Sequence, residues 1–380
     1  MKILFLCGSL EPGRDGVGDY TRRLAAECIR QGHEARILAL CDREDSNFSD
    51  SVFEAETTQC DESTCVRCTR WSAGRDWAWK SERLVEILRR DCPDVVSIQF
   101  VPYAFNARGL PFPFLRCVAR CREVKGIHWH IMFHELWIGP QKRKPLSSRI
   151  IARLQRAMIG RLKFCDSIHT HLPVYKESLA RIGIAAKPLP LFSNIACTAP
   201  VAESKAIGRV VNIGFFSQQE PVTEVRDWII AFVRDAEKQG CSVCLHLAGK
   251  LESATENYWR ENLADNASIV VHGWMTPEEI SIYLRSLDLG VTTVPRHAIG
   301  KSGSVAAFFE HGIPVAAPFV AHSPTGLFIE SEREMVLDHF GDLTRHRWRP
   351  EQKTEKLVSV CTDFLDSLDA SSSRSVSEQV

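Results

Sequence analysis

Residues 297–315 form the clearest candidate binding site in this chain. The stretch reads His-Ala-Ile-Gly-Lys-Ser-Gly-Ser-Val-Ala-Ala-Phe-Phe-Glu-His-Gly-Ile-Pro-Val, which predicts a Gly/Ser loop, a short helix ending at Gly312, and a strand. Small residues leave amide N–H groups exposed at a helix N-terminus, where the helix dipole favours anions, and Lys301 adds a positive charge. This pattern is typical of a phosphate or diphosphate site. It is not a P-loop, because Pro295 stands where that motif needs glycine. The alternative is an ordinary turn with a solvated lysine.

Composition indicates a soluble protein without a general affinity for nucleic acid. The chain has 380 residues, 44% hydrophobic and 25% charged, which is enough for two domains with full cores. Its 47 basic and 47 acidic residues cancel, which argues against nucleic acid as a partner. Several of the 14 cysteines, such as Cys7, Cys41 and Cys244, lie in or beside apolar runs and suggest reduced core thiols in a cytoplasmic protein. No apolar run reaches the length of a membrane span. The N-terminal run at residues 2–8 is too short for the apolar region of a signal peptide with a cleavage site.

Strands and helices alternate along the whole chain. The pattern predicts an N-terminal Rossmann-like domain over 1–190 with an insertion at 43–75, and a second such domain over 205–345. Repeated strand–helix units imply parallel sheets, with ligands outside the carboxyl ends of the strands. A last helix near 351–369 carries an apolar stripe, so we expect residues 346–380 to cross back to the N-terminal domain and end in a disordered tail. The stripe consists of Leu357, Val360, Phe364 and Leu368.

Several motifs, taken in order, resemble those of GT-B glycosyltransferases of family 4. They are Gly8 with the Asp-Gly-Val-Gly-Asp-Tyr run at 15–20, Phe-His-Glu-Leu-Trp at 133–137, Leu-Ala-Gly-Lys at 247–250, Val-His-Gly-Trp at 271–274 and Glu-His-Gly-Ile-Pro-Val at 310–315. The resemblance covers almost the whole chain outside 43–75. It implies two Rossmann-like α/β domains with parallel sheets facing across a cleft.

The resemblance also implies a reaction and a set of site residues. A sugar would pass from a nucleotide-diphosphate donor to a hydroxyl, with the retaining outcome inherited by analogy. Helix N-termini and basic side chains would stabilise the diphosphate leaving group, without a metal or cofactor. His134 and Glu135 would act at the reacting sugar, while Gly16, Val17 and Gly18 would form an acceptor or phosphate loop. The donor residues would be Lys301, Ser302, Gly303, Ser304, Gly249, Lys250, His272 and Gly273.

Two departures from the family pattern leave an alternative open. The paired glutamates of the family fall on Ile299 and Ala307, and Glu310, about one turn further on, is expected to face solvent. The basic pair expected near 216–223 is also absent. A non-catalytic GT-B protein that binds nucleotide sugar or acts as a partner subunit is therefore the main alternative. A dehydrogenase is a weaker one, because no Gly-x-Gly-x-x-Gly follows the first strand.

Three further patterns suggest other contacts. Cys60, Cys65 and Cys68 have spacings compatible with zinc, although a fourth ligand is not obvious. His128 and His130 share one face of a strand, where packing is favoured over metal binding. The helix predicted at 147–164 carries Arg149, Arg153, Arg156 and Arg161. These arginines form either a solvated face or a peripheral contact with a membrane, where a lipid-linked glycan could be the acceptor.

Overall fold

The computed structural model divides the chain into two compact units, which we describe separately. Unit 1 comprises Met1–Leu189 and Leu357–Val380, and unit 2 comprises Pro190–Lys356. The expected domains were 1–190 and 205–345. The structure describes residues 1–13, 15–43, 53–137, 146–197, 209–216, 222–249, 253–263, 267–320, 325–345 and 356–377.

Unit 1 is built on an eight-stranded sheet of order β3-β4-β2-β1-β5-β6-β7-β8. All of its pairings are parallel except the one between β3 and β4. The central strands are buried apolar runs, as a parallel sheet covered on both faces requires. The strands are β1 (Lys2–Cys7), β2 (Glu34–Asp42), β3 (Glu54–Asp61), β4 (Thr64–Ser72), β5 (Val95–Phe100), β6 (His128–Phe133), β7 (Ser167–Thr170) and β8 (Lys187–Pro188).

The expected insertion at 43–75 contains a β-hairpin that extends this sheet. Strand β4 pairs with β2, and β3 forms the outer edge. Cys60 and Cys65 face each other across the hairpin and form a disulfide, so neither is a free thiolate for zinc. Cys68 is buried in the core. The zinc alternative for these cysteines therefore does not fit the structure, whereas Cys7, Cys41 and Cys244 are free thiols, as expected.

Helices cover both faces of the unit 1 sheet. On one face, side chains of α2 and α4 pack with those of the central strands in a large apolar cluster. On the other face lies α1, whose first turn is capped by Asp15. The helices are α1 (Gly16–Arg30), α2 (Trp77–Asp91), α3 (Pro102–Phe105), α4 (Phe112–Cys121), α5 (Leu146–Ile159), the 3₁₀ turn η2 (Gly160–Phe164) and α6 (Pro173–Ala180).

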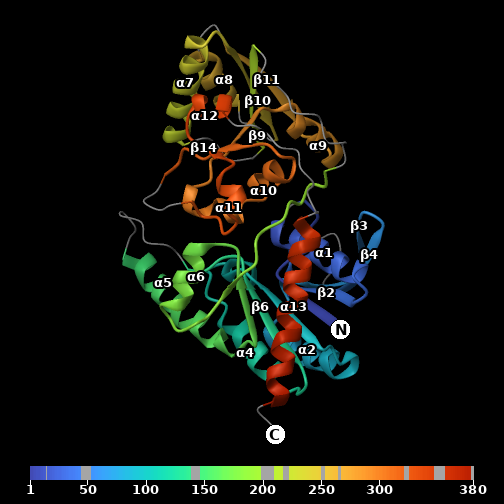
Figure 1. The fold of residues 1–380 in the computed structure, drawn as a ribbon. Coiled ribbons are helices and arrows are strands. Elements are labelled where there is room, and N and C mark those ends of the chain that lie inside the picture. Colours follow the sequence, from blue (N-terminus) through green and yellow to red (C-terminus); the bar gives the residue numbers. More distant parts are fainter. Residues whose placement is uncertain are drawn as a thin grey trace. The chain divides into compact units, whose positions relative to one another are not determined.

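The C-terminal helix α13 (Lys356–Ser377) packs on unit 1 (Figure 1). Phe364 is fully buried, with its ring centroid 5.9 Å from that of Phe5 and 4.9 Å from that of His130. The Sγ atoms of Cys361 and Cys28 lie 3.6 Å apart. A segment far away in sequence therefore completes the core of the N-terminal unit. The helix runs past the expected end near residue 369.

Unit 2 has a six-stranded parallel sheet of order β11-β10-β9-β12-β13-β14. The sequence Thr-Pro-Glu-Glu at 276–279 predicts a capping box, and the structure confirms it at the start of α9, where the side chains of Thr276 and Glu279 each accept from the other's backbone amide. The strands are β9 (Val210–Phe216), β10 (Ser242–Ala248), β11 (Ala267–Gly273), β12 (Leu289–Val291), β13 (Val315–Ala316) and β14 (Val336–Leu337). The helices are α7 (Thr223–Lys238), α8 (Ser253–Asn262), α9 (Pro277–Ser286), the 3₁₀ turn η3 (Arg296–Lys301), α10 (Gly303–Glu310), α11 (Glu330–Arg333) and α12 (Phe340–Arg345).

The predicted α/β fold with two parallel sheets is confirmed. Among the described residues, no helix is long and apolar enough to cross a membrane.

Candidate functional site

In unit 1, a small pocket opens at the carboxyl ends of β1 and β2. Its volume is about 290 Å³, at the sheet edge where ligands of parallel α/β folds bind. Glu11 and Asp15 line it together with Arg43 and Tyr103, and Arg43 donates a hydrogen bond to the carbonyl of Tyr103 at 3.4 Å. The remaining lining residues are Gly8, Ser9, Cys41 and Ala104. The pocket therefore combines two carboxylates with one guanidinium.

The expected acceptor or phosphate loop is capped by a carboxylate. Asp15 Oδ1 accepts hydrogen bonds from the amides of Val17 and Gly18, both at 3.0 Å. Burial raises the pKa of Asp15, and the two amide hydrogen bonds oppose that rise. Because both amides already bind this carboxylate, they are engaged within the loop rather than directed at a ligand.

Two glycines of this loop provide a matched stability test. A Cβ added to Gly18 would lie 2.7 Å from the carbonyl oxygen of Ser9, whereas one added to Gly16 would meet nothing within 4 Å. We expect Gly18→Ala to destabilise unit 1 by about 1–3 kcal/mol, because helix and loop must move apart. Gly16→Ala should cost nothing or stabilise by up to about 1 kcal/mol. Chemical unfolding of both variants checks this, and equal losses would contradict the close packing at Gly18.

His134 follows β6 and is held by a buried chain of polar groups. Its Nε2 lies 2.9 Å from Gln99 Oε1, and its Nδ1 lies 2.9 Å from His171 Nε2. Its side chain is 6% exposed, so its ring nitrogens are engaged inside the unit. The resemblance assigns this residue to the reacting sugar. In the structure, its ring also links the side chains of Gln99 and His171. Glu135 follows it and is half-buried.

His130 on β6 and His169 on β7 form a second buried pair. His130 Nδ1 lies 2.8 Å from Ser97 Oγ, and its Nε2 lies 3.0 Å from His169 Nδ1. Burial lowers the pKa of both rings, to about 4 for His169. His130 is thus packed and hydrogen-bonded, as expected, and His128 bonds Ser167 at 3.0 Å. No group of residues that could hold a metal ion is found within the described ranges.

Acid should therefore destabilise unit 1 over a defined range of pH. His169 titrates near pH 6.5 in the unfolded chain and near 4 when folded, so the unfolded state binds more protons between these values. The contribution of neutral His169 to the stability of unit 1 is complete above about pH 6.5 and is lost as the pH falls toward 4. From pH 7 to pH 5, His169 alone should cost about 2 kcal/mol. Urea unfolding of wild type and His169→Gln at both pH values tests this. An unchanged pH dependence in the variant would contradict it.

In unit 2, the expected anion site lies where η3 passes into α10. Ser302 caps α10 by accepting from Val305 N at 3.4 Å, and its Oγ lies 3.0 Å from that of Ser304. The amides of Gly303 and Ser304 occupy the first turn, where a helix leaves N–H groups without intrahelical partners. Lys301 is half-buried at the end of η3. The expected Gly/Ser loop is thus a 3₁₀ turn that leads directly into the helix.

The positions aligned with the paired glutamates of the family belong to the apolar core. Ile299 and Ala307 are 1% and 0% exposed. Glu310 was expected to face solvent, and this is wrong: it is half-buried, and its carboxylate accepts a hydrogen bond from the amide of Ser193. That bond binds α10 to the chain segment that enters unit 2.

The other donor candidates lie at the carboxyl ends of β10 and β11. Gly249 donates to the carbonyl of Gly273 at 2.8 Å, and both glycines have positive φ, +106° and +69°. His272 is exposed, and its Nε2 lies 2.9 Å from His246 Nδ1. Burial lowers the pKa of both histidines, so the neutral forms are favoured. Lys250 and residues 217–221 lie outside the described residues.

Sequence reasoning missed several residues that line the unit 1 pocket. Glu11 and Arg43 come from two separate loops and Tyr103 from the short helix α3, and none of them carries a motif of its own. Asp15 could have been found, because an aspartate directly before Gly16 and an apolar helix is a frequent N-cap.

On α5, Ile150 and Leu154 are 55% and 42% exposed beside Arg149 and Arg153.

Comparison with known proteins gives one family match and many structural matches. Residues 15–195 match the model of the glycosyl transferase 4-like domain. No curated protein matches the chain in sequence.

Similar solved structures span both units. The catalytic domain of starch synthase IV from Arabidopsis thaliana, bound to ADP and acarbose, has a TM-score of 0.57 at 12% identity, with 98% of this chain and 99% of that chain covered. α,α-Trehalose 6-phosphate synthase from Burkholderia multivorans has a TM-score of 0.56 at 11% identity, with 100% of this chain and 98% of that chain covered. UDP-GlcNAc 2-epimerase from Neisseria meningitidis, bound to UDP-GlcNAc, has a TM-score of 0.50 at 8% identity, with 97% of this chain and 99% of that chain covered. The chain thus has the GT-B fold of glycosyltransferases, with a glycosyl transferase 4-like domain over residues 15–195.

Proposed function

We propose that this protein transfers a sugar from a nucleotide-diphosphate donor to a hydroxyl acceptor. The observation that carries the proposal is the start of α10, where Lys301 and a helix N-terminus meet at the carboxyl side of the unit 2 sheet. The family match over residues 15–195 supports a transferase. Two solved structures of similar fold hold ADP or UDP-GlcNAc, which supports a nucleotide-linked donor.

The donor diphosphate would bind in unit 2. The amides of Gly303 and Ser304 can donate to phosphate oxygens, while Lys301 contributes a full charge. These groups would stabilise the negative charge that develops as the diphosphate leaves. His272, paired with His246, would present a neutral ring to the donor. Trp274, which is 81% exposed, offers an indole face for stacking on a nucleobase.

The acceptor would bind in unit 1 at the pocket lined by Glu11 and Asp15. Carboxylates accept hydrogen bonds from sugar hydroxyls, whereas they repel phosphate groups. We propose that His134 and Glu135 position the loop beside the reacting sugar. Since the His134 ring is bonded to Gln99 and His171, the backbone carbonyl of His134 is the group suited to contact a cationic sugar centre.

A membrane-linked acceptor is a further part of the proposal. Helix α5 exposes Ile150 and Leu154 together with Arg149 and Arg153. Apolar side chains can enter the lipid boundary while arginines contact anionic headgroups. This would bring a lipid-linked glycan to the protein. A hexosyl donor and a retaining outcome rest on the family resemblance alone.

A screen of nucleotide sugars tests the function. Purified protein would be incubated with UDP-, GDP- and ADP-linked hexoses and candidate glycan acceptors, and release of the nucleoside diphosphate would be measured. Thermal unfolding with each nucleoside diphosphate would run in parallel. Acceptor-dependent release from one donor is the expected result. Stabilisation without turnover would contradict the enzyme and indicate a binding protein, and the absence of both would contradict the donor site.

A further inference from the structure

A second and larger pocket lies at the amino ends of β1 and β2 in unit 1, at the edge opposite the candidate acceptor site. Its volume is about 780 Å³, within the range of small-molecule sites. Four basic side chains line it, Lys2, Arg36, Arg67 and Arg90, against two carboxylates, Glu34 and Asp91. Neither the family resemblance nor the proposed reaction uses this edge of the sheet.

The strand register places two arginines side by side. Leu4, Arg36, Arg67 and Thr58 form one row across β1, β2, β4 and β3, and Arg36 is the direct neighbour of Arg67. Like charges at adjacent positions repel, so this pairing does not serve the stability of the sheet. A pair of residues that destabilises the sheet locally points to a function, because the residues of a natural protein otherwise tend to stabilise its fold.

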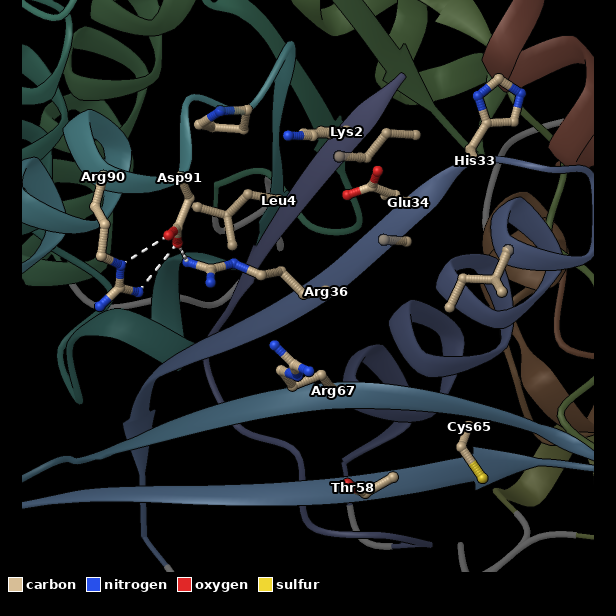
Figure 2. A pocket seen from close by; sticks show the side chains of 14 residues that line it. Lys2, Leu4, His33, Glu34, Arg36, Thr58, Cys65, Arg67, Arg90 and Asp91 are labelled. Carbon is tan, nitrogen blue, oxygen red and sulfur yellow. Dashed lines mark hydrogen bonds and ion pairs between the residues drawn. The ribbon is translucent and has the colours of Figure 1, made fainter.

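The carboxylates around the pocket do not neutralise the arginines. Arg90 makes a two-point contact with Asp91, at 2.7 and 3.1 Å, and Arg36 forms an ion pair with the same carboxylate (Figure 2). Glu34 stands opposite Lys2 in the register and offsets that charge. The side chain of Arg67 is exposed and has no ion-pair or hydrogen-bond partner within the described part of the chain. Arg36 and Arg90 therefore share one carboxylate, and Arg67 adds a third guanidinium without an ion pair of its own.

The neighbouring arginines also affect the acidity of Arg36. Burial lowers the pKa of Arg36, and the charges of Arg90 and Arg67 lower it further, while Asp91 and Glu56 oppose the change. A bound anion would relieve this repulsion. Guanidinium groups hold phosphate through paired N–H donors, which gives geometry as well as charge.

We propose that this pocket binds a phosphorylated small molecule, with its phosphate group held by Arg36, Arg67 and Arg90. The volume leaves room for an organic group beside the phosphate. The proposal does not depend on the donor site in unit 2, so each can fail without the other.

Calorimetric titration at constant ionic strength tests the site, with inorganic phosphate and glucose 1-phosphate as probes. Arg67→Gln should weaken binding of both by about tenfold or more, because it removes one charge-assisted contact. Arg116→Gln, at an exposed position on α4, is the control and should bind like wild type. Tighter binding of glucose 1-phosphate than of phosphate would support an organic ligand. Equal affinity in both variants would overturn the proposal.

Two further variants test whether the anion binds at these arginines rather than in unit 2. Asp91→Asn should tighten phosphate binding several-fold, since that carboxylate competes with the ligand for Arg36 and Arg90. A purely structural arginine cluster would not show this gain. Lys301→Ala should leave phosphate binding at the arginines unchanged. Loss of phosphate binding in Lys301→Ala, together with full binding in Arg67→Gln, would place the anion in unit 2 and contradict the pocket.

Discussion

Replacing Phe364 with alanine should lower the free energy of unfolding of unit 1 by about 3–5 kcal/mol. The side chain is fully buried and packs against Phe5 of the first strand and His130 of β6. Its loss would leave a cavity between α13 and the sheet, and would free the helix from the central strands. Denaturant unfolding, followed by hydrogen exchange of amides in β1 and β6, measures the effect.

The neighbouring Asp363→Ala is the matched control for this change. Asp363 is exposed on the same helix, so its replacement should alter stability by no more than about 0.5 kcal/mol. Exchange protection in β1 and β6 that stays at the wild-type level in Phe364→Ala would show that α13 does not support the N-terminal unit.

Lys301→Ala should weaken the binding of a nucleoside diphosphate by about ten- to a hundredfold. A charge-assisted hydrogen bond is typically worth about 1.5–3 kcal/mol, which corresponds to this range. Lys301→Arg should recover little in a compact site, because the planar guanidinium needs more room. Calorimetry with UDP, GDP and ADP is the direct measurement.

Lys238→Ala provides the control for charge loss in unit 2. This lysine is exposed on α7, where it pairs with Asp235 at 2.8 Å, so its removal should not change the affinity. If Lys301→Ala bound the nucleotide as tightly as Lys238→Ala, the assignment of the diphosphate to α10 would be wrong.

The sheets were the predictable part of this fold, because their central strands are short apolar runs separated by helices. Val210–Phe216 and Ser242–Ala248 read this way, and the Thr276 capping box fixed the start of α9. The hairpin at β3 and β4 was not predictable. Its outer strand alternates between half-buried and exposed positions and is largely polar, so no apolar pattern marks it.

The candidate sites were only partly accessible to sequence reasoning. Lys301 and the small residues after it are adjacent in the chain, so their chemistry could be read directly. The hydrogen bonds of His134, in contrast, reach Gln99 on β5 and His171 beyond β7, and Glu310 binds Ser193 from a distant segment. Such partners depend on tertiary packing. The same holds for Arg36 and Arg67, which the strand register makes neighbours.

A crystal structure of the protein with a nucleoside diphosphate tests the central claim most directly. The account predicts the diphosphate at the start of α10, within hydrogen-bonding distance of the Lys301 ammonium and the amides of Gly303 and Ser304. The base should lie on the side of His272 and Trp274. A diphosphate bound instead at the Asp15 loop of unit 1, with the start of α10 empty, would contradict the assignment of the donor site and of the proposed reaction.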